Sequence, residues 1–242
     1  MNRFFVDEHG IVNDIARLEA TDAHHALKVM RLGIGDEITL MDGKNLYLAQ
    51  IADTANNQVT CRIVKPLPST EARLRVTLYQ GLPKGDKMDL IVQKATELGV
   101  DTIVPVAMKR CVVQLKGKDG EKKQERWQKI AREAAKQCGR AQVPAVHTPI
   151  ALNKIQFEGA LVIPWEDEHS ASLTAFHLKH PELTRLSVLI GPEGGIAPEE
   201  IDFLPGEPIT LGPRILRTET AGLCALSALY TLYGDLGDNT PC

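Results

Sequence analysis

Several features that mark large classes of proteins are missing from this chain of 242 residues. No apolar run approaches the roughly 18 residues that a membrane-spanning helix needs, so no membrane partner is expected. The five cysteines include no Cys-x-x-Cys pair, which argues against a zinc site and against a disulfide framework. The segment from Met1 to Asp7 turns acidic too soon for a secretory signal. We therefore expect a cytoplasmic protein that binds no metal.

The glycine-rich segment Gly191-Pro192-Glu193-Gly194-Gly195 lacks both common nucleotide-binding patterns. A P-loop needs Lys followed by Ser or Thr at the start of the next helix, where this chain has Ile196 to Glu199. The Gly-x-Gly-x-x-Gly pattern of dinucleotide folds is absent as well. Glycines still leave N–H and C=O groups unshielded, so this loop can contact an adenine edge and a ribose. The alternative is an ordinary tight turn.

Charge is distributed unevenly in a chain whose net charge is -3. From Lys109 to Arg140 there are eleven Lys or Arg against four Asp or Glu, whereas from Pro181 to Cys242 there are three against nine. A basic segment inside an acidic protein is what binding to a phosphate backbone requires. The alternative is a solvated helix face with ion pairs between successive turns.

The first 68 residues have the pattern of a small β-rich unit. Asp42-Gly43 predicts a tight hairpin between the strands Glu37–Met41 and Leu46–Ile51. Further strands are expected at Arg3–Val6 and Gln58–Val64, and a helix at Thr21–Met30. Prolines in the segment 66–70 favour a boundary there, which predicts domains at 1–68 and 72–242.

The rest of the chain alternates apolar strands with helices, which predicts an α/β domain with a mainly parallel sheet. A helix from Asp86 is expected to end at Gly99, and a second helix covers Lys122–Cys138. Strands ending at Ile190 and Leu211 are each followed by a Gly-Pro loop and a helix. Small ligands bind beyond such strand ends in open α/β sheets.

The loop from Arg214 to Ala221 holds two arginines, a carboxylate and two threonines. A helix start favours anions, so these cations are expected to meet a substrate phosphate or carboxylate. The alternative is a structural ion pair, either Arg217 with Glu219 or Arg214 with Glu193. The adjacent His24 and His25 do not converge on one ion when they lie on a helix, so they predict no metal site.

Five stretches taken together resemble a known family. They are Lys84-Gly85-Asp86-Lys87-Met88, Gln93 to Gly99, Gln137-Cys138-Gly139-Arg140, Leu189 to Gly195 and Leu211 to Ala221. In this order they are similar to the SPOUT superfamily of knotted methyltransferases, and more narrowly to the ribosomal small-subunit RNA methyltransferase E family. That family methylates N3 of a uridine in 16S ribosomal RNA of the small ribosomal subunit.

The resemblance implies a SPOUT-type α/β domain with a C-terminal trefoil knot and a homodimer in which the last helix contributes to the interface. It also implies an N-terminal PUA-like β-barrel that binds RNA together with the segment from Lys109 to Arg140. It also implies that S-adenosylmethionine binds in the knot. The residues expected to hold it are Pro164, Trp165, Glu166, Ile190, Gly191, Pro192, Glu193, Gly194, Gly195, Leu211, Gly212, Ile215, Leu216, Thr218, Thr220 and Ala221.

Uridine N3 becomes a good nucleophile only after it loses its proton, so the reaction needs a proton acceptor or a group that stabilises the anion. Arg217 is the candidate for stabilising a uridine oxygen or orienting the cofactor, and Glu219 is the candidate base. The residues expected to contact RNA are Arg31, Lys84, Lys87, Arg110 and Arg140. Two alternatives stay open: a knotted methyltransferase with another RNA target, and a non-catalytic RNA-binding module.

Overall fold

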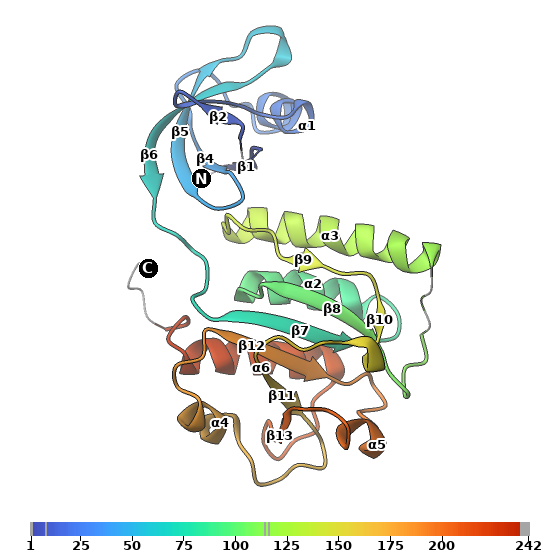
Figure 1. Ribbon diagram of the computed structural model, residues 1–242. Coiled ribbons are helices and arrows are strands. Elements are labelled where there is room, and N and C mark those ends of the chain that lie inside the picture. Colours follow the sequence, from blue (N-terminus) through green and yellow to red (C-terminus); the bar gives the residue numbers. More distant parts are fainter. Residues whose placement is uncertain (1, 8, 114, 116, 238–242) are drawn as a thin grey trace. The chain divides into compact units, whose positions relative to one another are not determined.

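The computed structural model describes residues 2–7, 9–113, 115 and 117–237, and its contacts divide them into two units (Figure 1). Unit 1 holds the residues up to Glu71 together with Ala135–Val143. Unit 2 holds Ala72–Ala134 and the residues from Pro144 onward. The domain bounds of 1–68 and 72–242 stay a prediction, and their last part, 238–242, lies outside the described residues.

Unit 1 is built on a curved sheet that forms a half-barrel (Figure 1). Among the described residues its strand order is β1-β4-β5-β6-β3-β2, in which β1 runs parallel to β4 and the other pairs are antiparallel. Its apolar core is closed by Phe4, Ile38 and Leu40, all fully buried. The strands are β1 (Arg3–Phe5), β2 (Ile11–Val12), β3 (Ile15–Arg17), β4 (Glu37–Met41), β5 (Leu46–Asp53) and β6 (Thr60–Leu67).

The predicted hairpin between β4 and β5 is confirmed, and Asp42 explains its shape. Its carboxylate accepts hydrogen bonds from the backbone N–H groups of Lys44 at 2.9 Å and Asn45 at 2.7 Å. Gly43 has a φ of +91°, a conformation that side chains disfavour. The carboxylate therefore replaces the backbone hydrogen bonds that a tighter turn would make.

Three details of unit 1 differ from the sequence prediction. The helix expected at Thr21–Met30 is divided into α1 (Ala20–His24) and a π-helical turn, His25–Val29. Strand β6 continues through Pro66, which pairs with Tyr47 of β5 on one side. On the other side, β3 pairs only with Thr60 to Arg62, so no neighbouring strand needs an N–H from Pro66. The hairpin of β2 and β3 was not predicted.

Unit 2 contains a sheet whose described strands are all parallel, which confirms the α/β prediction. Their order is β10-β8-β7-β12-β11-β13, with β9 also paired to β8. The trefoil knot stays a prediction. The strands are β7 (Arg75–Gly81), β8 (Thr102–Ala107), β9 (Ala145–Val146), β10 (Ile150–Ala151), β11 (Ala160–Pro164), β12 (Arg185–Ile190) and β13 (Glu207–Ile209).

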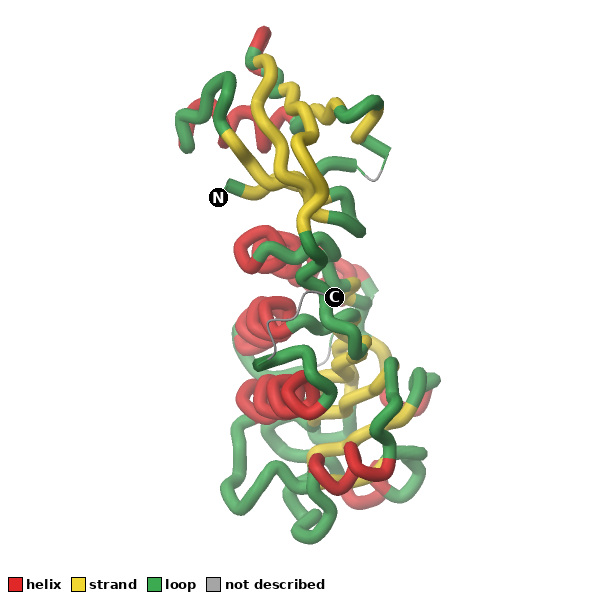
Figure 2. The backbone as a smooth tube through the Cα atoms, turned by 90° about the vertical axis from the view of Figure 1, so that its left-hand side faces the viewer, coloured by secondary structure: helices red, strands yellow, loops and turns green. Residues whose placement is uncertain are grey.

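Helices cover the sheet of unit 2, and α2, α3 and α6 stack along one of its sides (Figure 2). Helix α2 begins after Asp86 and ends at Gly99, whose φ of +110° gives the predicted left-handed stop. Among the described residues no helix is both long and apolar enough to cross a membrane. The helices are α2 (Lys87–Leu98), α3 (Lys118–Cys138), α4 (Leu173–Lys179), α5 (Pro198–Ile201) and α6 (Thr218–Leu232). A short 3-10 turn lies at Leu152–Lys154 in unit 2, and another lies at Ala55–Asn57 in unit 1.

Three neighbouring strands of this sheet, β12, β11 and β13, end on the same edge because they are parallel. The loop 191–197 follows β12, the loop 165–172 follows β11, and the loop 210–217 follows β13. These segments are separated in the sequence by other strands and helices, and the strand order brings them together. The sheet thus gathers backbone-rich loops at its carboxyl edge, where α/β folds bind small ligands.

Candidate active site

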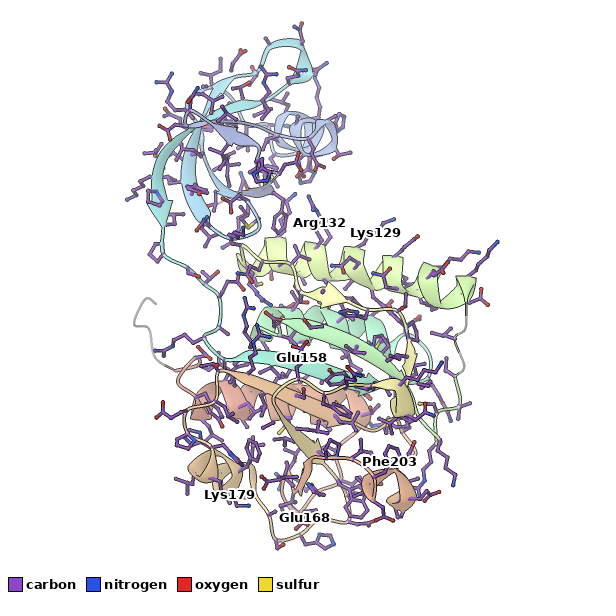
Figure 3. All side chains as sticks on the ribbon, viewed as in Figure 1. Lys129, Arg132, Glu158, Glu168, Lys179 and Phe203 are labelled. Atoms are coloured by element: carbon purple, nitrogen blue, oxygen red, sulfur yellow. The ribbon has the colours of Figure 1, made fainter. Side chains whose placement is uncertain are left out.

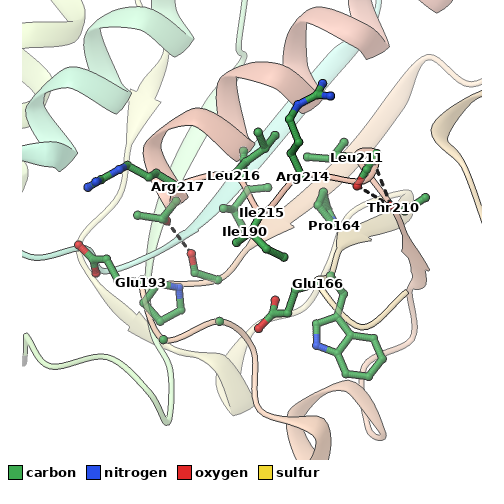
Figure 4. Close-up of a pocket in the computed structure, with 18 of the residues that line it drawn as sticks. Pro164, Glu166, Ile190, Glu193, Thr210, Leu211, Arg214, Ile215, Leu216 and Arg217 are labelled. Carbon is green, nitrogen blue, oxygen red and sulfur yellow. Dashed lines mark hydrogen bonds between the residues drawn. The ribbon is translucent and has the colours of Figure 1, made fainter. Parts of the chain in front are cut away.

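The three loops enclose a cavity of about 540 Å³ within unit 2 (Figure 4). This volume lies in the range of small-molecule and cofactor pockets. Thr220 is the one predicted cofactor residue that does not line it. Arg217 lines the cavity and Glu219 does not. The lining residues that were predicted for the cofactor are Pro164, Trp165, Glu166, Ile190, Gly191, Pro192, Glu193, Gly194, Gly195, Leu211, Gly212, Ile215, Leu216, Thr218 and Ala221.

The glycine loop, Gly191–Gly195, is held by close backbone packing. A Cβ on Gly81, the last residue of β7, would lie 2.6 Å from the backbone nitrogen of Pro192. A Cβ on Gly191 would lie 3.0 Å from the carbonyl carbon of Gly195. Gly195 has a φ of +71°, and its N–H donates to the Pro192 carbonyl at 2.9 Å. Glycine is therefore required on both sides of this turn, and the backbone forms one wall of the cavity.

Thr218 connects the start of α6 to the glycine loop. Its hydroxyl donates to the Gly191 carbonyl at 2.6 Å and accepts from Nε2 of Gln80 at 2.9 Å. Both side chains are buried, and Gln80 Oε1 has no hydrogen-bond partner among the described residues. Buried hydrogen bonds of this kind are costly to break, because each lost partner leaves a desolvated polar group. The loop after β12 is thereby fixed relative to β7 and α6.

A second connection joins Lys87, at the start of α2, to two carboxylates. Its Nζ lies 2.9 Å from Glu193 Oε1 and 3.3 Å from Glu219 Oε2. Glu193 also accepts from the Lys84 backbone N–H at 3.0 Å. The Glu193 hydrogen bond raises the pKa of Lys87. Burial opposes ionisation of Glu193, but the hydrogen bonds from Lys87 and Lys84 outweigh it and lower the pKa of that carboxyl.

The two arginines of the loop after β13 are exposed and extend in different directions (Figure 4). Arg217 extends on the side of Glu193, and Arg214 extends away from it. Neither guanidinium makes an ion pair within the part of the chain that the structure describes. The alternative ion pairs of Arg217 with Glu219 and of Arg214 with Glu193 are therefore wrong, since both carboxylates face Lys87. Arg217 is left available to an anionic group of a ligand.

The residues predicted to contact RNA lie in different surroundings. Arg31 and Lys84 are exposed, whereas Arg110 donates from its guanidinium to the Gly194 carbonyl at 2.9 Å. Arg140 is only 6% exposed, and its guanidinium binds Glu71 at 2.8 Å within unit 1. An arginine held in this way braces the end of α3 and has little surface left for a phosphate. Lys87, as shown above, is occupied by two carboxylates.

Exposed cations follow α3 in the basic segment. Lys129 and Arg132 project from the side of α3 opposite the sheet of unit 2 (Figure 3). Farther along the same helix, Arg126 is paired with Asp89. That ion pair joins α3 to α2 and not two turns of α3, so the alternative of a solvated helix with ion pairs to its own turns stays a prediction.

Sequence reasoning missed part of the cavity wall. His169 and Thr210 line it although no sequence pattern pointed to them, and Lys87 lines it although it was predicted to contact RNA. The loop that carries His169 is shaped by Glu168, which accepts from the N–H groups of Ser170 at 2.7 Å and Ala171 at 2.9 Å; these hydrogen bonds lower the pKa of Glu168 to about 2. The available signal was the polar segment Glu168-His169-Ser170, which begins four residues after the end of β11. The described residues contain no group of three or more possible metal ligands.

Comparison with known proteins agrees with this geometry. Residues 70–230 match the family model described as an RNA methyltransferase domain, and residues 18–64 match that of an RNA methyltransferase PUA domain. The ribosomal RNA small subunit methyltransferase E of Bacillus subtilis is 36% identical over 86% of this chain and 86% of its own length. The protein of that name from Mycobacterium tuberculosis is 30% identical over 95% of this chain and 91% of its own.

A solved structure gives the same result in three dimensions. The ribosomal RNA small subunit methyltransferase E of Neisseria gonorrhoeae, bound to S-adenosyl methionine, superposes with a TM-score of 0.81 at 34% identity. The match covers 96% of this chain and 98% of that protein. Both the parallel sheet and the half-barrel are therefore part of a shared fold.

Proposed function

We propose that this chain, which belongs to the ribosomal RNA small subunit methyltransferase E family, methylates N3 of a uridine in 16S ribosomal RNA. The observation that supports this most strongly is the cavity at the carboxyl edge of the parallel sheet, enclosed by three loops of which one is a packed glycine turn. The similar structure from Neisseria gonorrhoeae binds S-adenosyl methionine.

The residues of the cavity fit S-adenosylmethionine. Its adenosine part requires polar backbone groups beside apolar surface, which the glycine loop, Ile190 and the loop around Leu211 provide. The carboxylate and amino groups of its methionine part require polar partners of both signs, and Arg217 and Glu166 line the same cavity. When bound there, S-adenosylmethionine supplies an electrophilic methyl group.

Arg217 and Glu219 are proposed to act on the uridine. A guanidinium beside the O2 or O4 atom stabilises the negative charge that develops when N3 loses its proton. Arg217 is exposed, lines the cavity and has no protein partner among the described residues, so it is free to do this. Glu219 follows it by two residues and is the candidate acceptor of the proton, although Lys87 must share that carboxylate.

Lys87 is proposed here to position these groups, in place of a direct RNA contact. Its amino group joins the glycine loop, through Glu193, to the first turn of α6, through Glu219. Fixing both carboxylates keeps the cavity wall and the candidate base in one arrangement before substrate arrives, which lowers the cost of reaching the transition state.

RNA contacts are proposed for the exposed cations Arg31, Lys84 and Arg110, and for the outer face of α3. Cations at this density bind phosphates without reading the base sequence. The target uridine has to be unstacked to reach a cavity of this kind. We also propose that two copies of the chain associate through α6, which remains to be tested by measuring the molar mass in solution.

The function is tested by incubating the purified protein with S-adenosylmethionine and small ribosomal subunits from cells that lack this activity. Nucleosides are then released by digestion and identified by mass spectrometry. N3-methyluridine in the wild-type reaction, and at least a hundredfold less of it with Arg217→Ala, is the expected result. Arg214→Ala is the matched control and retains more activity. A 2′-O-methylated nucleoside, or methylation of transfer RNA in a parallel reaction, indicates another knotted methyltransferase. RNA binding without any methyl product indicates a binding module.

A further inference from the structure

Unit 1 contains a pocket of its own, with a volume of about 490 Å³. It lies between the end of β3, the helical segment 20–28 and the 3-10 turn between β5 and β6. This unit 1 pocket is lined by Arg17, Leu18, Ala20, Ala23, His24, Leu27, Lys28, Asn56, Asn57 and Gln58. None of these residues belongs to the catalytic site proposed above.

The lining of the unit 1 pocket is cationic and includes no carboxylate. Arg17 and Lys28 are exposed, and neither makes an ion pair with a residue that the structure describes. Two nearby carboxylates are engaged elsewhere: Asp22 binds Lys136 at 2.7 Å, and Asp53 accepts the backbone N–H of Ala55 at 3.2 Å. The lining itself therefore carries the positive charges of Arg17 and Lys28 and no carboxylate, which fits an anionic ligand.

Three consecutive amides complete the polar wall. Asn56, Asn57 and Gln58 are exposed, and their side chains make no hydrogen bond within the described chain. Asn56 and Asn57 have φ angles of +55° and +60°, so both residues of this turn adopt the left-handed conformation that asparagine tolerates better than most residues. A side-chain amide offers both donors and an acceptor, so it can pair with the edge of a nucleobase.

The floor of the pocket is apolar and fixed. Leu18 and Ala23 belong to the core of unit 1, and the Leu18 N–H donates to the Val59 carbonyl at 3.0 Å. That bond joins the end of β3 to the residue after Gln58. The pocket thus has a preformed apolar floor beneath exposed polar groups, which suits the flat face of a base with its phosphate outside.

We propose that the unit 1 pocket binds one nucleotide of single-stranded ribosomal RNA, with Arg17 and Lys28 on the phosphate and the three amides on the base edge. Single-stranded RNA is required because a paired base cannot turn its edge into a pocket. This inference rests on the proposed function, which supplies ribosomal RNA as the substrate. It adds a second point of recognition, away from the methylated uridine.

The first experiment measures RNA affinity against salt with the full-length protein and small-subunit ribosomal RNA. The variant Arg17→Gln/Lys28→Gln is compared with Arg62→Gln/Lys65→Gln, which removes the same charge from exposed positions of β6 outside the pocket. The pocket variant is expected to bind roughly tenfold more weakly and to lower the slope of log K against log salt by about 0.7, the value for one phosphate of a single strand. Equal effects in both double variants would overturn the proposal.

The second experiment locates the contact by ultraviolet crosslinking of RNA that contains 4-thiouridine, followed by peptide mass spectrometry. Crosslinks are expected in residues 17–28 and 55–58, and Asn57→Ala should reduce them without changing the salt slope. Crosslinks confined to unit 2 would refute the pocket. In methylation assays the pocket variant should have a raised KM for RNA with kcat and S-adenosylmethionine affinity unchanged. Failure of the proposed function is distinguishable, because it removes methylation from every variant and leaves the crosslinks in place.

Discussion

The two pockets differ in how their polar groups are satisfied. In the unit 2 cavity, Thr218, Glu193 and Lys87 have partners within the protein, and glycines bring backbone into direct contact. Its two arginines, Arg214 and Arg217, are the exception, since neither makes an ion pair with a described residue. In the unit 1 pocket, the cations and amides have no partner among the described residues. The first pocket is arranged before any ligand arrives, and the second leaves its side chains free to adjust.

This difference matches the two kinds of ligand that we propose. A small cofactor gains affinity from a rigid cavity, because little freedom is lost on binding. A flexible RNA strand can adopt many conformations. Long exposed side chains can change rotamer to contact each of them, with a small loss of specificity. Substitutions should therefore act sharply in unit 2 and gradually in unit 1.

The largest effect is expected from Gly81→Ala. The added Cβ would meet the Pro192 nitrogen at 2.6 Å, and because that atom is backbone the glycine loop has to move. Overpacking of this kind costs about 1–3 kcal/mol of stability. Calorimetry should show at least tenfold weaker S-adenosylmethionine binding. Gly33→Ala is the control, since its Cβ would meet nothing within 4 Å; similar losses in both variants would contradict the role given to close packing.

Thr218→Val is expected to follow, with a loss of about 1–3 kcal/mol in the free energy of unfolding. Valine keeps the shape but leaves the Gly191 carbonyl and the Gln80 amide without the hydroxyl they share. Urea unfolding measures the change. Thr231→Val is matched to it, because Thr231 is exposed on the same helix and donates only to the Ser227 carbonyl. Equal stability of the two variants would show that the buried connection is unimportant.

Lys87→Met should reduce the methylation rate several-fold and change how stability depends on pH. A lysine with a raised pKa adds stability below its ordinary value of 10.5 and loses it as pH rises through the folded value. A carboxyl with a lowered pKa adds stability above 4.5 and loses it as pH falls. The difference in the free energy of unfolding between wild type and Lys87→Met should therefore be greatest between pH 4.5 and pH 10.5, and it should shrink at lower and higher pH.

The pH dependence of Lys87→Met is read from thermal unfolding across this range, with Lys87→Arg as a partial rescue. If Lys87 instead bound RNA phosphate, the variant would change the salt slope of RNA binding and leave the pH dependence of stability alone. That outcome would restore the RNA-binding role that the resemblance assigns to Lys87.

Ile215→Ala should have the smallest effect on folding. This side chain is 82% exposed at the cavity, so the free energy of unfolding should change by less than about 0.5 kcal/mol. Cofactor affinity should nevertheless fall a few-fold, since a bound ligand would cover the apolar surface. Leu178→Ala, at a 74% exposed position of α4, should change neither quantity. A loss of stability in Ile215→Ala would contradict the view that this residue serves only the ligand.

Local patterns in the sequence were sufficient for much of the fold. The hairpin at Asp42-Gly43, the stop of α2 at Gly99 and the alternation of strands and helices each depend on residues close in sequence. The ends of β12 and β13 also located two of the three cavity loops. The β2–β3 hairpin escaped because its turn, Asn13-Asp14, reaches left-handed φ angles without a glycine.

Long-range pairing explains the remainder. Nothing near Lys87 in sequence indicates that its amino group meets Glu193 and Glu219, more than 100 residues away. Arg140 looked like an RNA ligand because it lies in a basic segment, but Glu71 buries its guanidinium. A charged residue can be assigned to a ligand only once its partners within the fold are known.

Isothermal titration of the full-length protein with S-adenosylmethionine tests most directly whether the glycine loop forms the cofactor site. Wild type should bind one molecule per chain. Gly194→Val should remain folded and bind at least tenfold more weakly, because even a Cβ there lies 3.1 Å from the Cβ of Arg110. Equal binding by the two proteins would place the cofactor elsewhere. A folded wild-type protein that binds none would contradict the proposed activity.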